Sequence, residues 1–365
     1  MKKISILRFL LIALFINMCM AMSAETIGDF EVTLDYDNKT AELLKYNGSA
    51  TELAIPSSVT LEGVAYSVTS IGESCFYQCE SIKSISIPES VKSIGTWCFG
   101  NCSALESIAI PESVTTLEAS CFLFCTALKS ITIPGSVTRL GEYCFGNCSS
   151  LESITLPSSV TTLGNSAFAG AGIQQISIPE SVTSIGARCF QGCYSLLSVT
   201  IPSSLTSLAG GTFSDCTSLL TINIPESVTS IGPWCFQGCS SLASIIILKS
   251  VTSLGDDCFA YCYEISEVTC KIATPISGNF FSDVPINQAT LKVPETSLEA
   301  YRTTEPWSGF GTIEAFSTSG INNNYINREV TIDAVYDLDG KISSTTSRGI
   351  KIVRMSDGTT RKVKR

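Results

Sequence analysis

One pattern of apolar and polar positions repeats along most of the chain. A phenylalanine recurs every 23 residues, with a single step of 22 between Phe168 and Phe190, at positions 76, 99, 122, 145, 168, 190, 213, 236 and 259. Prolines preceded by Ile or Leu keep the same phase at 88, 111, 134, 157, 179, 202 and 225. So strict a period over nine repeats is typical of a solenoid, in which each coil buries its apolar face on its neighbours.

Each repeat contains two short stretches expected to be extended and one expected to be a helical turn. Ile108 and Ile110 alternate with Ser107 and Ala109, which is the pattern of a half-buried strand. Pro111 ends this strand because proline has no amide to donate to a sheet. The following Ser-Val-Thr-Thr-Leu stretch supplies a second extended piece, and the segment Cys-Phe-x-x-Cys is interpreted as one helical turn that directs its phenylalanine inward. The sequence therefore predicts an α/β repeat of 23-residue coils with sheets along its length.

The repeat resembles a known family. Its pattern, LxSIxIPxSVTSIGxxCFxxC, is similar to the BspA-type leucine-rich repeats of secreted and surface proteins from Bacteroidetes-like bacteria. The stretch YNGSATELAIPSSVTLEGVAYSVTSIG (46–72) is similar to the long N-terminal coil of that family, and ATLKVPETSLEAYRTTEPWSGFGTIEAF (289–316) to its closing segment. The resemblance covers roughly residues 25–316. It implies a leucine-rich-repeat solenoid on a protein that is secreted or held at the outer cell surface.

The N-terminus has the pattern of a secretory signal peptide. Three cations precede an apolar run at 9–16, and small residues occupy much of 21–24. We expect cleavage near Ala24, and a lipoprotein signal through Cys19 is the alternative. The apolar run is too short for a spanning helix with those flanks, and no later stretch resembles a transmembrane segment.

The composition changes after residue 316. A polar linker is followed by two strand-like runs, AVYDLDGK and RGIKIVR, and by a basic end, TTRKVKR. This segment resembles the C-terminal sorting domains of type IX secretion substrates, with Tyr336, Gly340, Gly349 and Lys362 in matching positions. Lys351 departs from the aromatic residue usual there, and a small β module that only ends the chain is the alternative. The predicted organisation is a signal peptide at 1–24, an N-terminal cap and long first coil at 25–72, a solenoid at 73–272, a C-terminal cap at 273–316, a linker at 317–330 and a β module at 331–365.

Composition argues against several kinds of chemistry. A net charge of −10, with only 15% charged residues, argues against nucleic acid as a partner. The sequence has no histidine, which excludes histidine-activated nucleophiles and metal sites that need an imidazole. Carboxylates form no paired constellation, and glycine-rich phosphate loops are absent. We therefore expect no enzyme, no catalytic residue, no cofactor and no metal, in a protein that is monomeric.

Cysteines flank the phenylalanine in seven repeats, as the pairs 75/79, 98/102, 121/125, 144/148, 189/193, 235/239 and 258/262. Residues four apart on a helical turn have Cβ atoms about 5–6 Å apart, whereas a disulfide needs about 3.8 Å. A zinc site would need four sulfurs from two coils to converge. Because unpaired cysteine packs as a small hydrophobe, we interpret both columns as small apolar slots, which Ala167 and Ala171 fill in one repeat. Disulfides between neighbouring coils are the alternative.

Function is expected on the outward faces of the coils. The outward positions of the first strand form a ribbon rich in hydroxyls and almost without the Trp, Tyr and Arg that anchor tight protein interfaces. Such a ribbon suits weak contacts that gain strength by repetition. The candidate ligand-binding ribbon is Ser84, Ser86, Ser107, Ser130, Thr132, Ser153, Thr155, Gln175, Ser177, Ser198, Thr200, Thr221 and Asn223.

Two other columns have simpler interpretations. Beside the ribbon, charges alternate in sign from coil to coil, which predicts pairing between neighbouring coils, at Lys83, Glu106, Lys129 and Glu152. Trp97, Tyr143 and Trp234 share the position before the first cysteine, and local packing there is favoured over a sugar platform.

The sequence thus predicts a non-enzymatic surface protein. In this hypothesis the concave ribbon mediates adhesion by binding a host or bacterial surface protein or a glycan. The alternative is a structural coat or spacer with no specific ligand.

Overall fold

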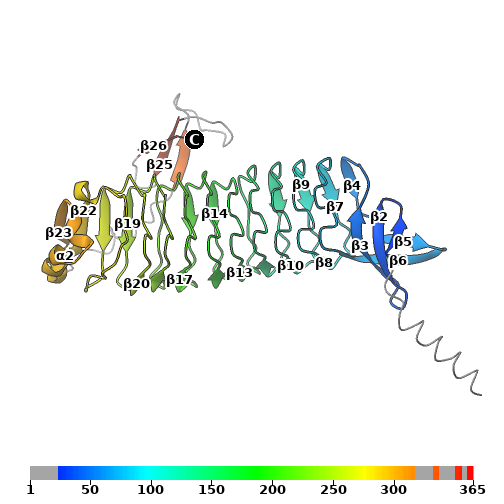
Figure 1. Cartoon of the computed structure of the whole chain (residues 1–365), viewed down its shortest axis with the longest axis horizontal. Coiled ribbons are helices and arrows are strands. Elements are labelled where there is room, and N and C mark those ends of the chain that lie inside the picture. Colours follow the sequence, from blue (N-terminus) through cyan, green and yellow to red (C-terminus); the bar gives the residue numbers. More distant parts are fainter. Residues whose placement is uncertain (1–23, 317–331, 337–349, 356–359, 365) are drawn as a thin grey trace, which may run out of the picture.

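The computed structural model describes residues 24–316, 332–336, 350–355 and 360–364. In it the chain forms a solenoid of short coils. Figure 1 shows the coils side by side along one long axis, with short strands on two long sides. The predicted solenoid with its 23-residue repeat is confirmed. The expected signal peptide, except Ala24, and the expected linker lie outside the described residues.

Four groups of strands build the fold. The N-terminal cap is a mostly antiparallel sheet of β1 Glu25–Ile27, β2 Phe30–Asp35, β3 Thr40–Tyr46, β6 Val64–Ile71 and β5 Ser58–Leu61. The first side of the coils carries β4 Glu52–Ala54, β7 Ser84–Ser86, β9 Ser107–Ala109, β11 Ser130–Thr132, β14 Gln175–Ser177, β16 Ser198–Thr200, β19 Ser244–Ile247, β21 Glu267–Cys270, β22 Thr290–Pro294 and β23 Thr312–Phe316. The second side carries β8 Ser93–Ile94, β10 Thr116–Leu117, β12 Arg139–Leu140, β13 Thr162–Leu163, β15 Ser184–Ile185, β17 Ser207–Leu208, β18 Ser230–Ile231 and β20 Ser253–Leu254. The last group, β24 Ile332–Tyr336, β25 Ile350–Met355 and β26 Thr360–Lys364, is an antiparallel sheet within the segment predicted as a β module.

Equal coil lengths put equivalent residues beside one another. Strand β9 pairs in parallel with β7 and β11, so that Ser107 lies opposite Ser84 and Ser130. Two coils join the first side only through isolated bridges, Thr132 to Thr155 and Thr200 to Asn223. Residues at the same position of successive repeats, which we call a column, therefore lie in a row along the solenoid.

The segment expected to be a helical turn is instead a run of tight turns, so that prediction was wrong. The amides of Cys98, Gly100 and Cys102 bond to carbonyls three residues back, at 2.9 to 3.3 Å. The alternate amides bond to carbonyls of the next coil, as Phe99 does to Cys121 at 2.9 Å. Left-handed backbone at Trp97 (φ 59) accompanies this alternation and prevents helical continuation.

The predicted phenylalanine spine is confirmed, and it is longer than expected. All nine rings are buried, and neighbouring rings stack with centroids 5.3 to 5.6 Å apart. Phe281 adds a tenth ring, stacked 5.5 Å from Phe259. Tyr46 covers the first ring and Trp307 the last, at centroid distances of 5.4 and 5.5 Å. The apolar core thus runs through the whole solenoid and ends in aromatic caps.

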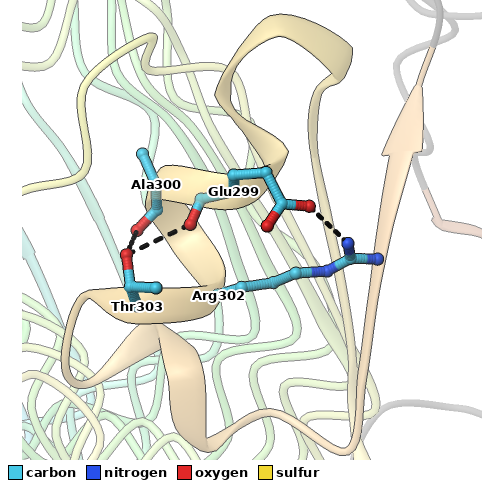
Figure 2. Close-up of polar contacts among 4 residues, drawn as sticks. All are labelled: Glu299, Ala300, Arg302 and Thr303. Atoms are coloured by element: carbon cyan, nitrogen blue, oxygen red, sulfur yellow. Dashed lines mark hydrogen bonds and ion pairs between the residues drawn. The ribbon is translucent and has the colours of Figure 1, made fainter.

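A short helix closes the C-terminal end. It comprises α2 Leu298–Thr303 with the flanking 3-10 turns η1 Ile286–Gln288, η2 Glu295–Ser297 and η3 Trp307–Gly309. Buried Tyr301 packs on Trp307 and donates a hydrogen bond of 2.9 Å to the carbonyl of Ile272. Figure 2 shows the solvent side of the same helix, where Arg302 pairs with Glu299 at 2.6 Å and the Thr303 hydroxyl bonds to two backbone carbonyls. None of the described helices has the length and apolar character to cross a membrane.

Candidate ligand-binding surface

The structure brings the thirteen ribbon residues onto the first side of the coils. In each strand the intervening residue points inward: Ile85, Ile108 and Ile131 are at most 7% exposed. Ten of the thirteen ribbon residues are exposed, and Ser84, Ser198 and Thr221 are half-buried. In the coil after Asn223, Ile246 occupies the same position and is 41% exposed, so an apolar side chain interrupts the hydroxyl row before Thr269.

The ribbon side chains differ in their hydrogen bonding from the serine and threonine columns that precede the second strand. Within the described part of the chain, none of the thirteen makes a side-chain hydrogen bond. Serines before the second strand instead bond to carbonyls one coil earlier, as Ser136 does to Val114 at 2.5 Å and Ser159 to Val137 at 2.7 Å. Thr161 likewise bonds to the Thr138 carbonyl at 3.2 Å. Most serines before the second strand thus link neighbouring coils, with the buried hydroxyls of Ser90 and Ser227 as exceptions, whereas the ribbon leaves its hydroxyls for solvent or a ligand.

The predicted pairing of charges between coils is confirmed for Glu106 and Lys129. Their side chains meet at 2.6 Å, and this hydrogen bond and the lysine charge lower the pKa of Glu106. A second cross-coil ion pair joins Lys292 to Glu267 at 2.8 Å near the C-terminal end. Both pairs are partly exposed, so they favour the register of the coils more than overall stability.

The thiols are free and enclosed. All sixteen cysteines from Cys75 onward are unpaired, and all are buried except the half-buried Cys79, which confirms the packing interpretation over disulfides. Burial raises the pKa of Cys102 and Cys148 to about 12. Thiols this hard to ionise are poor nucleophiles and poor metal ligands. Within the described residues, no group of three or more potential metal-binding side chains occurs.

The outward aromatic residues lie on the turns around the phenylalanine. Trp97 packs edge-on against Tyr77, with centroids 5.7 Å apart, as local packing predicts. Tyr143 and Trp234 nevertheless remain 39% and 44% exposed. Sequence reasoning found these residues but not the left-handed backbone that they share, because glycine marks the equivalent position in one coil only, at Gly211.

These features define a leucine-rich-repeat protein without a visible reaction centre among its described residues. The profile described as "BspA type Leucine rich repeat region" matches residues 46–174 and 161–287, in six copies. The chain therefore belongs to the BspA-type leucine-rich-repeat family. No curated protein matches the chain.

Solved structures of other bacterial leucine-rich-repeat proteins have a similar fold. The T. pallidum leucine rich repeat protein is 24% identical over 67% of this chain and 91% of its own, with a TM-score of 0.43. A leucine rich cell surface protein from Faecalibacterium prausnitzii A2-165 is 24% identical over 83% and 97%, with a TM-score of 0.44. A leucine-rich repeat protein from Bacteroides ovatus is 24% identical over 80% and 99%, with a TM-score of 0.37. At this identity the likeness concerns the repeat fold alone.

Proposed function

We propose that this chain is an exported, non-enzymatic surface protein whose ribbon binds a protein or glycan on a host or bacterial surface. The observation that carries the proposal is the unused hydrogen-bonding capacity of the ribbon. Most serines of the column before the second strand form cross-coil bonds, as Ser159 does to the Val137 carbonyl, whereas none of the ribbon side chains does among the described residues. A row of free donors and acceptors on a rigid support binds polar, repeating ligands through many weak contacts.

Export supports this role. The N-terminal signal pattern and the similarity of the C-terminal segment to type IX sorting domains both favour delivery to the surface. Strands β24, β25 and β26 give that segment the three-stranded antiparallel form of a small β module. We propose residues 331–365 as the sorting module on this basis.

Residues 25–316 should be tested, immobilised at high density, against matrix proteins, mucins and a glycan array. The matched variant pair is Thr132→Glu with Thr155→Glu on the ribbon, and Ser184→Glu with Ser207→Glu on the second side. All four positions are exposed, so each pair adds two surface charges at little risk to the fold. We expect the ribbon pair alone to lose binding. Uniform silence towards all ligands would instead support a coat or spacer protein.

A further inference from the structure

A second periodicity runs along the turn that precedes the first cysteine. In every second coil this position carries a large side chain with a planar group, and in the coils between it carries a small residue. The large residues are Trp97, Tyr143, Arg188 and Trp234, and the small ones are Ser74, Ser120, Ser166, Gly211 and Asp257. We call these nine positions the platform column. Its repeat is two coils, whereas the spine repeats every coil.

The backbone does not favour large side chains in this column. All nine positions have φ between 51° and 66°. This left-handed region suits Gly, Asn and Asp, and it is unusual for bulky residues. Trp97 and Tyr143 therefore occupy positions where a smaller residue would be easier to accommodate. Side chains kept against local preference, on the surface, indicate selection for something other than folding.

Glycines in the same turns leave room for two of the rings. A Cβ atom added to Gly100 would lie 2.8 Å from the Trp97 ring, and one added to Gly146 would lie 3.4 Å from the Tyr143 ring. Each ring thus lies close to a glycine of its own turn, and Trp97 also packs edge-on against Tyr77 of the preceding coil. Tyr143 stays 39% exposed, and Trp97 is half-buried. In the coil of Trp234, Gln237 replaces the glycine.

The spacing of the platforms selects the ligand. Neighbouring coils are about one pyranose apart, since spine rings lie 5.3 to 5.6 Å from one another. In an extended β-1,4-linked polysaccharide successive sugars are turned by half a rotation, so the same face recurs at every second sugar. Aromatic rings bind the apolar face of a sugar by stacking. A two-coil repeat of exposed planar groups therefore matches the two-sugar repeat of such a chain lying along the solenoid axis.

The surrounding charge favours a neutral polysaccharide. In each coil the turn segment runs from two residues before the first cysteine position to the second cysteine position, as in 73–79. The nine turn segments hold one cation, Arg188, and five carboxylates, Glu73, Glu142, Asp215, Asp256 and Asp257. Arg188 is one of the four large residues of the platform column, and its planar guanidinium can donate hydrogen bonds to sugar hydroxyls. An anionic glycan would meet repulsion along the same edge.

We propose that the platform column binds a neutral β-1,4-linked polysaccharide, one sugar per coil, with Trp97 and Tyr143 as its best-built stacking positions. This site is on a different part of the coil from the ribbon and does not depend on it. The ribbon and the platform column can therefore fail separately.

Calorimetric titration of the chain after the predicted signal peptide, residues 25–365, with cellohexaose, mannohexaose and N-acetylchitohexaose tests the proposal, with α-linked maltohexaose as the control ligand. The test variant is Trp97→Asn with Tyr143→Asn, because asparagine tolerates the left-handed backbone and should preserve the fold. The matched control is Tyr194→Ala, a tyrosine 63% exposed outside the column.

We expect at least one β-1,4 hexasaccharide to bind, with maltohexaose much weaker. The double variant should lose about tenfold or more in affinity, as removal of a stacking partner does, with an unchanged or raised melting temperature. Tyr194→Ala and the ribbon pair Thr132→Glu with Thr155→Glu should bind normally. No binding of any β-1,4 hexasaccharide, equal binding of maltohexaose, or full binding by the double variant would overturn the proposal. Those outcomes leave the function of the ribbon untouched.

Discussion

The thiol of Cys102 donates a hydrogen bond of 3.1 Å to the carbonyl oxygen of Phe76, one coil earlier. The same bond, at 3.1 to 3.2 Å, recurs along the solenoid from Cys125, Cys148, Cys193, Cys216, Cys239 and Cys262 to Phe99, Phe122, Phe168, Phe190, Phe213 and Phe236. The second cysteine column therefore supplies a buried donor as well as volume. A thiol engaged in this way needs its proton, and oxidation to a disulfide would remove it.

The first prediction concerns thiol reactivity. Under non-reducing denaturing conditions, all sixteen cysteines of the mature chain should titrate with a thiol reagent, because the structure pairs none of them. In the native protein only half-buried Cys79 should react quickly. The variant Cys79→Ser should remove that fast phase and leave the others slow. A near-zero titre in denaturant would instead establish disulfides between coils.

The second prediction concerns alkaline pH. Burial raises the pKa of Cys148 to about 12, whereas an unfolded thiol titrates near 8.5. Below about pH 8 the thiol keeps its proton in both the folded and the unfolded chain, so it contributes fully to the free energy of unfolding. Above that pH only the unfolded chain ionises, and the free energy of unfolding falls until the folded thiol titrates as well. Each such thiol can lower the free energy of unfolding by up to about 1.4 kcal/mol per pH unit. The melting temperature should therefore fall steeply between about pH 9 and 11.

A variant of one coil gives the control for this pH effect. Cys144→Ala with Cys148→Ala reproduces the pair Ala167 and Ala171 found in the next coil. It should be less stable at neutral pH, because two buried side chains become smaller. It should also lose less stability per pH unit than the parent chain. Parallel pH curves for the two proteins would show that these thiols do not carry the alkaline effect.

Sequence reasoning reached the spine, the buried thiols and the outward ribbon because each is a column with a fixed period. It missed Phe281, whose coil lacks the Cys-Phe-x-x-Cys pattern. It also took the turns for a helical turn, since Trp97 conceals a left-handed position that glycine would have marked. The bond from Ser136 to the Val114 carbonyl could not be read either, because a serine that bridges coils looks like any surface serine.

The third prediction concerns export. If residues 331–365 are a sorting module, deleting them should leave a folded solenoid in the periplasm, because the described hydrophobic core ends with Trp307, Phe310 and the partly buried Ile313. Cell fractionation with a proteolysis test of surface exposure measures this. The matched control replaces Tyr194 with alanine, far along the sequence from the module. Unchanged surface delivery of the truncated chain would show that the module is not the signal.

The last prediction concerns the spine. Phe145 is fully buried, and its ring stacks between those of Phe122 and Phe168 at 5.4 and 5.5 Å. Phe145→Ala should cost about 3–5 kcal/mol, because burial is lost and a cavity remains. Each coil contacts only its neighbours, so this defect weakens the link between two blocks of coils. Thermal or denaturant unfolding should show a sharply lower midpoint, and the single transition should split in two.

Thr132→Ala is the control for this substitution, one coil away on the exposed ribbon. It removes a side chain with no internal hydrogen bond among the described residues, so the free energy of unfolding should change by no more than about 0.5 kcal/mol. The comparison separates two columns of the coil: stability depends on the buried phenylalanine of the turns, and ligand contact depends on the outward side chains of the first strand. The reverse order, a tolerated Phe145→Ala beside a destabilising Thr132→Ala, would contradict the assignment of the spine as the core and the ribbon as free surface.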